Sequence, residues 1–422
     1  MTLPGGPLAG AAALHLCYDD VREPLIESQV VAYLRELARA GAAVHFLTFE
    51  KERLAPEERA EIEARLRAQG IRWRGLRYHR RPSLPATLFD VAQGARAALA
   101  IARRERVRLV HARSHVAGAM ASLVCRRLGL PLLFDLRGLL AEEYVDNGHW
   151  RRGGLKYWLT TAMERRLLRS ASGVVLLTER LRLELAALEP RLGRPEAPVE
   201  VIPCCVDTAR FSRGEAERAA TRGRRGWGDR VVLIYAGKLG GWYPPRDIAR
   251  FFARAREREP TLFLQVATQS DPRELLSAIA ELGVASGDHD VRLVPGAEIP
   301  ALLGAADAGL SLVRPSPSKR ASSPTKVGEY LAAGLPVVST SGIGDGDALL
   351  SAHRVGVLVG DASDAAYQAG FEQLCALLRD RATPDRCRRV AEEQLSLARV
   401  GGPRYARLYA RLLAGERAPA EH

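Results

Sequence analysis

The chain has 422 residues, more than one ordinary hydrophobic core accommodates, so its length predicts two domains. Hydrophobic residues make up 47% of the sequence, but no apolar run approaches the roughly 18 residues that a membrane-spanning helix needs. The sequence therefore excludes an integral membrane protein built from helices, and its net charge of +13 predicts a basic surface.

The positive charge has three interpretations: a nucleic-acid partner, an anionic membrane surface, or solvated arginine-rich faces. No RNA-binding or helix-turn-helix signature accompanies the charge, so we expect no nucleic-acid partner. Residues 150–170, WRRGGLKYWLTTAMERRLLRS, are the best candidate for peripheral contact with an anionic membrane, because basic and aromatic residues accompany an apolar helical stripe. The alternative is an ordinary surface helix that packs Leu159, Met163 and Leu167 inward.

The N-terminal sequence and the cysteines bear on location. No basic region precedes the first apolar run, so we expect no signal peptide. The six cysteines form no CxxC pair and no metal-ligand spacing, which is typical of reduced thiols in a cytosolic protein. We therefore expect a cytoplasmic protein, and peripheral contact with the inner membrane face stays open.

In the first half of the chain, short apolar runs alternate with helical patterns. This alternation predicts a parallel sheet with helices on both faces. The predicted strands are 13–17, 42–49, 108–112, 132–136, 174–177 and 199–202. The predicted helices are 26–40, 56–69, 91–104, 117–129 and 179–188.

A polar, charged segment at 203–230 interrupts the pattern, which then restarts. The second set of predicted strands is 231–237, 262–267, 291–294, 308–313, 335–340 and 355–360, and helices near 384–398 and 404–414 close the chain. We predict two doubly wound, Rossmann-like α/β domains, and the cleft between them is the default ligand site. The predicted bounds are 1–203 and 204–385, and the helices of 386–422 are expected to pack back toward the first domain.

The turn after the strand that ends at Gly237 is the first candidate for binding an anion. Lys238 follows directly, and Gly240 and Gly241 allow close backbone approach to a phosphate before a helix that starts after Pro245. Strand–glycine–helix turns are common in α/β proteins, so a tight turn with a surface lysine is the alternative.

The second candidate is the stretch 322–340, SSPTKVGEYLAAGLPVVST. Ser322 or Ser323 is expected to cap a helix, with Pro324 at its first position. A lysine in the first turn opposes the helix dipole, but it suits an anion held by the free N–H groups there. Thr325 and Lys326 would contact that anion, and the Glu329 carboxylate one turn later would accept bonds from sugar hydroxyls. The alternative is a plain i, i+3 ion pair between Lys326 and Glu329.

Two stretches of the first domain, HARSH (111–115) and FDLRG (134–138), follow strands and predict acceptor-side residues. Asp135 would orient an acceptor hydroxyl or act as a base, and Arg113 or Arg137 would meet a phosphate. A structural ion pair between Asp135 and Arg137 is equally compatible. His111 is expected to be a buried, satisfied histidine.

At these residues the chain resembles the family 4 glycosyltransferases of the GT-B fold, along nearly its whole length. The most specific stretches are VIPCCVDTARF (201–211) and EYLAAGLPVV (329–338). The other matching stretches are 108–138, 172–185, 235–243, 291–313 and 323–328. The resemblance implies two Rossmann-like domains that face each other across a cleft, with the nucleotide on the second.

The resemblance also implies an activity of the hexosyltransferase-like EC 2.4 class. A sugar would pass from a nucleotide-diphosphate donor, expected to be a UDP-sugar, to a lipid-linked, polysaccharide or other glycan acceptor. Retention, no metal and no cofactor are implied. Lys238 and Lys326 would neutralise the diphosphate as a leaving group, with phosphate contacts from Ser323 and Thr325. Glu329 would bind the donor ribose. The remaining implied contacts are Glu298, Ile299 and Pro300 at the base, and His115 on the acceptor side.

Two departures from the family keep other functions open. The first acid of the family's paired motif is replaced by Ala321, and CYDDVREPLIESQ (17–29) stands where a glycine-rich loop is usual. The alternatives are a noncatalytic, nucleotide-sugar-binding scaffold with a degenerate site, and a nucleotide-sugar epimerase of the same fold. The Asp-x-Asp strings at 288–290 and 345–347 are weak signals for a metal-bound diphosphate, and we expect no metal.

Overall fold

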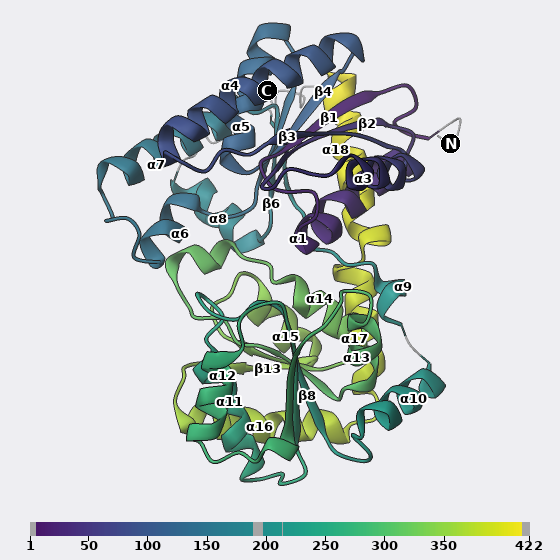
Figure 1. Cartoon of the computed structure of the whole chain (residues 1–422), viewed down its shortest axis with the longest axis vertical. Helices are drawn as coiled ribbons and strands as arrows, with labels where there is room; N and C mark the ends of the chain where they lie inside the picture. Colours follow the sequence, from purple (N-terminus) through teal and green to yellow (C-terminus); the bar gives the residue numbers. More distant parts are fainter. Residues whose placement is uncertain (1–5, 189–196, 213, 416–422) are drawn as a thin grey trace, which may run out of the picture. The chain divides into compact units, whose positions relative to one another are not determined.

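The computed structural model describes residues 6–188, 197–212 and 214–415. The chain forms two compact units (Figure 1). The first comprises Met1–Pro203 together with Leu397–His422, and the second comprises Cys204–Ser396. In the described ranges, no helix has both the length and the apolar character needed to cross a bilayer.

The first unit is built on a parallel sheet whose strand order is β3-β2-β1-β4-β5-β6-β7 in the described residues. Its strands are β1 (Ala12–Cys17), β2 (Ala43–Glu50), β3 (Ile71–Arg77), β4 (Leu109–Arg113), β5 (Leu132–Leu136), β6 (Gly173–Leu176) and β7 (Val199–Val201). Its helices are α1 (Pro24–Ile26), the π-helical turn η1 (Glu27–Val31), α2 (Ala32–Arg39), α3 (Pro56–Ala68), α4 (Ser83–Arg104), α5 (Ser114–Leu128), α6 (Leu140–Asp146), α7 (Leu155–Ser170), α8 (Glu179–Leu188), η4 (Leu397–Gly401) and α18 (Gly402–Ala414).

The second unit repeats this plan with the strand order β10-β9-β8-β11-β12-β13. Its strands are β8 (Val232–Ala236), β9 (Phe263–Thr268), β10 (His289–Leu293), β11 (Ala308–Ser311), β12 (Val337–Thr340) and β13 (Gly356–Val359). Its helices are α9 (Thr208–Phe211), α10 (Glu215–Arg225), α11 (Pro245–Arg256), α12 (Arg273–Glu281), η2 (Ser286–Asp288), α13 (Ile299–Ala305), η3 (Pro317–Ala321), α14 (Thr325–Ala332), α15 (Gly346–His353), α16 (Asp364–Arg379) and α17 (Thr383–Gln394).

Strand β3 is absent from the sequence prediction. The strand lies at the edge of the sheet, where basic side chains such as Arg72 and Arg74 point to solvent. Gly75 interrupts its interior, and glycine weakens the strand signal further. An edge strand of this composition carries little of the apolar alternation on which the prediction depends.

The predicted start of the C-terminal segment at residue 386 falls inside α17. This helix stays with the second unit because Cys387, Val390 and Ala391 are buried in that unit's core. The part of the chain that groups with the first unit starts at Leu397.

Helix α18 covers one face of the first sheet through a polar layer. The Tyr405 hydroxyl donates to a carboxylate oxygen of Asp135 at 3.0 Å, and the Tyr409 hydroxyl lies 2.9 Å from Nδ1 of His111. The opposite face carries an apolar cluster with α4 and α5, which includes Leu14, Val110 and Met120. The polar side chains are therefore held between the sheet and its last helix.

We expect Tyr405→Phe to lower the free energy of unfolding by about 1.5–3 kcal/mol, because the buried Asp135 carboxylate loses a hydrogen-bond donor. Urea unfolding measures this change. Tyr144→Phe removes a hydroxyl from the exposed helix α6 and serves as the control, with less than about 0.5 kcal/mol expected. Equal effects of both substitutions would contradict a stabilising role for the Tyr405 bond.

Candidate active site

The second sheet has its topological switch point between β8 and β11; the turn after β8 carries Lys238, and helix α14, which follows β11 and η3, carries Lys326. Gly237 follows β8 with a φ of 141°, and Gly240 and Gly241 have φ values of 88° and 63°. Gly240 and Tyr243 close the turn with two backbone bonds of 2.8 and 3.1 Å. These positive φ angles explain why the turn needs glycine.

The start of α14 differs from the prediction. The helix begins at Thr325, Pro324 occupies the N-cap position, and no side chain caps the helix. Because the proline separates Ser323 from the first turn, its hydroxyl accepts instead from the backbone N–H of Cys204 at 3.1 Å. The first-turn N–H groups of α14 are thus left for another acceptor.

The Lys326 side chain is buried, with only 8% of its surface exposed. Its Nζ atom lies 3.9 Å from the centre of the Tyr235 ring and 4.6 Å from that of Tyr243. A Cβ atom added to Gly237 would lie 3.1 Å from the same Nζ, so the glycine and the lysine amine are in close contact. Within the described part of the chain, Nζ has no hydrogen-bond partner.

Burial lowers the pKa of the Lys326 amine to about 7, and the Glu329 carboxylate opposes this shift only in part. The two tyrosine faces also favour the charged form, by about 0.5–2 kcal/mol. This stabilisation is smaller than the free-energy cost of removing an ammonium group from water without giving it an acceptor. The net effect on the pKa of Lys326 is therefore downward. The i, i+3 ion pair is wrong as an explanation, because no ion pair involves Lys326 among the described residues.

Glu329 is half-buried one turn along α14. Burial raises the pKa of its carboxyl group, while the charges of Arg210 and Lys326 oppose the shift. Arg210 also donates to the carbonyl of Gly296 at 2.7 Å, so it connects the surroundings of Glu329 with the loop before α13.

The other predicted donor residues are spread around this centre. Lys238 is exposed, and its carbonyl accepts a hydrogen bond from the Tyr235 hydroxyl. Thr325 is half-buried at the first position of α14. Glu298 is exposed and lies 3.3 Å from Arg225, and Ile299 and Pro300 begin α13. The structure brings Gly237, Lys326 and α14 together, whereas Glu298 lies at the β10 side of the sheet.

Two residues that the sequence analysis missed also line this region. Lys319 is buried on η3, and its Nζ lies 3.5 Å from the centre of the Trp242 ring. The Trp242 Nε1 atom is buried and has no hydrogen-bond partner in the described ranges. The only sequence signal is the aromatic pair that follows Gly240 and Gly241, and it does not specify a partner.

The Asp-x-Asp strings serve other contacts. Asp288 lies 2.6 Å from Arg230, and Asp290 forms a hydrogen bond of 2.9 Å with Arg292. Asp347 accepts from the backbone N–H of Gly342. Across residues 6–188, 197–212 and 214–415, no group of three His, Cys, Asp or Glu residues is arranged to hold a metal. Metal independence itself stays a prediction.

In the first unit, Asp135 is fully buried at the end of β5, with one carboxylate oxygen 3.5 Å from Arg137. Burial alone would raise the pKa of Asp135, but Arg137 and His111 together lower it well below its usual range. Asp135 is thus held ionised in a structural layer, as the ion-pair alternative predicts. His111 Nδ1 lies 2.9 Å from the Tyr409 hydroxyl, and its Nε2 atom lies 3.8 Å from the Asp135 carboxylate without a hydrogen bond in the described residues.

His115 is buried on α5, and its Nε2 atom lies 2.7 Å from the Glu164 carboxylate of α7. This contact joins two helices. Arg113, at the end of β4, is buried beside Asp135 in the parallel register.

The loop after β1 is held by a carboxyl pair that the sequence analysis missed. Asp20 accepts from the backbone N–H of Lys51 at 3.0 Å, and Glu50 accepts from that of Val21 at 3.2 Å. Burial and a hydrogen bond with Asp20 raise the pKa of Glu50 to about 8. A buried carboxyl pair therefore shapes the loop that replaces the family's glycine-rich one.

Residues 26–205 match a family model described as a glycosyl transferase 4-like domain. This part of the chain is a glycosyl transferase 4-like domain. The predicted family resemblance is confirmed at this level.

A curated relative is the 2-deoxystreptamine glucosyltransferase of Streptomyces kanamyceticus, which is 30% identical over 159 residues. The alignment covers 36% of this chain and 40% of that enzyme, so it spans less than half of the relative's length.

Solved structures match the whole chain. Sucrose-phosphate synthase from Thermosynechococcus elongatus has a TM-score of 0.72 at 14% identity, and the match covers 96% of this chain and 100% of that one. HepE of Anabaena, in complex with UDP and glucose, has a TM-score of 0.67 at 16% identity, with coverage of 96% and 100%. At these identities the likeness shows the fold. The predicted GT-B fold class of two Rossmann-like domains is confirmed.

We expect Lys326→Met to raise the stability of the second unit, increasingly so as the pH falls from about 10 to 7. The pKa of Lys326 is about 7 in the folded protein, below its value in the unfolded chain. Between pH 10 and 7 the unfolded state therefore binds the proton first, and the stability of the wild type decreases as the pH decreases. The slope is at most about 1.4 kcal/mol per pH unit. Urea unfolding of both proteins at several pH values measures it.

The matched control is Lys238→Met, which removes an exposed amine from the same region. We expect its unfolding free energy to stay within about 0.5 kcal/mol of wild type. A Lys326→Met protein that is less stable than wild type throughout this range would show that the amine is well solvated or paired.

Proposed function

We propose that the protein is a glycosyltransferase that moves a sugar from a nucleotide-diphosphate donor to a glycan-type acceptor. The observation that carries this proposal is the buried Lys326 Nζ, which has no acceptor in the described residues and adjoins the uncapped start of α14. An anion placed there satisfies the amine and the first-turn N–H groups together.

A diphosphate suits the arrangement better than a single phosphate. Lys326 and the first turn of α14 provide one set of donors, and Lys238 on the glycine-rich turn provides a second cation. Gly237, Gly240 and Gly241 add no side chain that would keep a phosphate from the backbone. When the bond between the sugar and the diphosphate breaks, negative charge develops on the leaving phosphate, and the two lysines stabilise it.

The nucleoside would extend from the diphosphate along α14. Glu329 is one helical turn beyond Lys326, in position to accept from ribose hydroxyls. Arg210 lies between Glu329 and the loop before α13, so Glu298, Ile299 and Pro300 are the proposed contacts of the base. We propose a UDP-sugar as the donor, supported by the UDP complex of HepE, whose fold this chain shares.

The acceptor side belongs to the first unit in this proposal, with Arg113 and Arg137 as its contacts and a lipid-linked, polysaccharide or other glycan acceptor. Retention and independence from metals and cofactors are parts of the proposal that come from the family resemblance.

A noncatalytic nucleotide-sugar-binding scaffold is the second candidate, because the residue expected as the first acid is Ala321, which is fully buried. An assay of sugar transfer to an acceptor separates the glycosyltransferase from the scaffold and from an epimerase, because neither of these transfers a sugar to an acceptor.

We expect calorimetric titration without metal to detect binding of UDP, with GDP and ADP weaker. Lys326→Ala and Glu329→Ala should each weaken UDP binding by about 1.5–3 kcal/mol, because each removes a charge-assisted contact. Lys156→Ala, which removes an exposed lysine from the first unit, is the control and should leave binding unchanged.

Added Mg²⁺ should change the UDP affinity little if the lysines neutralise the diphosphate. The donor site would be refuted if wild type bound none of the three nucleotides, or if both substitutions left the affinity of UDP unaltered. Nucleotide binding without transfer to any acceptor would favour the scaffold.

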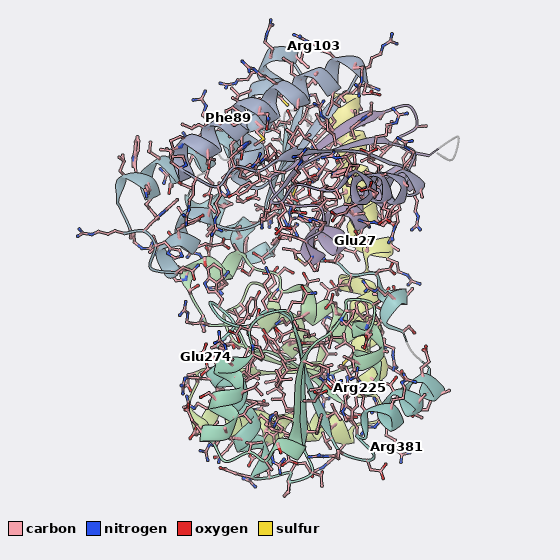
Figure 2. All side chains as sticks on the ribbon, in the orientation of Figure 1. Glu27, Phe89, Arg103, Arg225, Glu274 and Arg381 are labelled. Atoms are coloured by element: carbon pink, nitrogen blue, oxygen red, sulfur yellow. The ribbon has the colours of Figure 1, made fainter. Side chains whose placement is uncertain are left out.

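We further propose peripheral contact with an anionic membrane through α4 and α7, which both pack on α5. Exposed apolar side chains on α4 are Leu84, Leu88 and Phe89, the last labelled in Figure 2. Those on α7 are Leu155, Trp158 and Leu159. Leu159 thus points outward, contrary to the surface-helix alternative, while Leu167 is buried as that alternative predicts. Exposed Arg151, Lys156 and Arg166 flank the apolar residues of α7 and suit an anionic surface.

We expect wild type to cosediment with phosphatidylglycerol vesicles and much less with phosphatidylcholine vesicles. The double variant Trp158→Ser, Leu159→Ser should bind at least about tenfold more weakly, since each buried apolar side chain contributes about 1.5–3 kcal/mol. Leu276→Ser, at an exposed apolar position of α12, is the matched control. Equal binding by wild type and the double variant would remove α7 from the contact.

A further inference from the structure

The switch point of the first sheet lies between β1 and β4, which are neighbours in the sheet although the chain leaves them toward opposite edges (Figure 1). Ligands of doubly wound sheets bind at the carboxyl ends of the strands at such a point. Arg113 is the last residue of β4, and it pairs in register with Cys17 of β1 and with Asp135 of β5.

Arg113 is a buried cation without a close partner. Its side chain belongs to a residue that is 6% exposed, and Nη1 is buried without any hydrogen bond in the described ranges. The Asp135 carboxylate accepts from Tyr405 through one oxygen, and its other oxygen lies 3.5 Å from Arg137 and has no hydrogen bond in the described ranges. Two arginines thus lie near one carboxylate, so the positive charge exceeds the negative charge there.

The surrounding ionisable groups do not remove this excess. Burial, followed by the charge of His111, lowers the pKa of His15 well below its usual range. Burial likewise lowers the pKa of His111, although Asp135 opposes the shift. The Glu164 carboxylate faces His115 at 2.7 Å rather than Arg113.

The residue that follows Arg113 has an unusual backbone. Ser114 begins α5 with a φ of 67°, one of the few non-glycine residues with a positive φ in the described chain. Such backbone strain is found preferentially at ligand and active sites. No side chain caps α5, whose first turn starts directly after Arg113 in the sequence, so the N–H groups of that turn have no side-chain acceptor.

We propose that Arg113 and the first turn of α5 bind a phosphate or diphosphate group of the acceptor. The guanidinium fork and the helix N–H groups match phosphate oxygens in number and direction. The assignment to the acceptor rests on the proposed function, in which the second unit holds the donor. The acceptor class is then a phosphorylated one, such as a prenyl diphosphate-linked sugar, and the other source of the same group is the donor's own diphosphate.

The test is calorimetric titration of the full chain with inorganic pyrophosphate and with geranyl diphosphate, in the presence of saturating UDP. UDP occupies the Lys326 site, so added diphosphate reports on the first unit. We expect binding by wild type, at least tenfold weaker binding by Arg113→Gln, and an intermediate loss in Arg113→Lys, which keeps the charge but not the fork. Arg127→Gln, at an exposed position near the other end of α5, is the control and should stay within twofold of wild type.

The stability of the variant separates this role from a structural one. Because no protein group pairs with Nη1, Arg113→Gln should unfold at a temperature no lower than wild type, and pyrophosphate should raise the unfolding temperature only of proteins that keep an arginine or lysine at position 113. A variant that melts well below wild type, with unchanged diphosphate affinity in Arg113→Lys and Arg113→Gln, would overturn the proposal.

The remaining outcomes decide the source of the group. If Arg113→Gln weakens UDP and not geranyl diphosphate, the site takes a diphosphate but from the donor. If wild type binds no UDP, the proposed donor site fails. The two diphosphates are then titrated into Lys326→Ala with Arg113 intact and with Arg113→Gln, and weaker binding without Arg113 supports the phosphate site. If neither diphosphate binds wild type, the phosphate site is refuted even where UDP binds.

Discussion

Both candidate sites depend on one constraint: a cation that is held out of water needs an acceptor. Lys326 has only the faces of Tyr235 and Tyr243 around its amine, and Arg113 shares a single carboxylate with Arg137. Neither arrangement stabilises the folded chain by itself, since each leaves a buried donor unpaired. A ligand anion would complete such groups, and both lie near the switch point of their sheet, where ligands of doubly wound domains bind.

In both units an uncapped helix starts near a buried cation, but the residues that leave the helix uncapped differ. In the second unit, glycines with positive φ bring the backbone close to the amine, and the proline before Thr325 keeps a serine from capping α14. In the first unit, a strained Ser114 begins α5 directly after the arginine, again without a cap. In both cases the sequence just before the helix leaves its first-turn N–H groups without a side-chain cap, and a buried cation lies within two residues of the helix start.

Much of this could be read from the sequence, because the relevant signals are local. The β-α alternation predicts both sheets, and the conflict between a first-turn lysine and the helix dipole already singles out Lys326. The errors come from tertiary context. Burial of Lys326 against two rings, the failure of Ser323 to cap, and the basic edge strand β3 all depend on neighbours that lie far away in the chain. Trp242 and Lys319 were missed for the same reason, since their contact joins a turn after β8 to η3.

The polar layer under α18 shows why the acceptor side was harder to predict. Asp135 has the position and chemistry of a base, yet Tyr405 and Arg137 hold it ionised and buried. Its role in the structure is to order the cations around it, and that role becomes visible only when α18, nearly three hundred residues later in the chain, is seen to supply the hydroxyl. Asp135 therefore acts through its neighbours, and Arg113 is the cation of this layer whose Nη1 has no hydrogen bond in the described ranges. Asp135, which the sequence pattern predicts as a base, and Arg113, which we propose as the ligand contact, are thus register partners on the neighbouring strands β5 and β4.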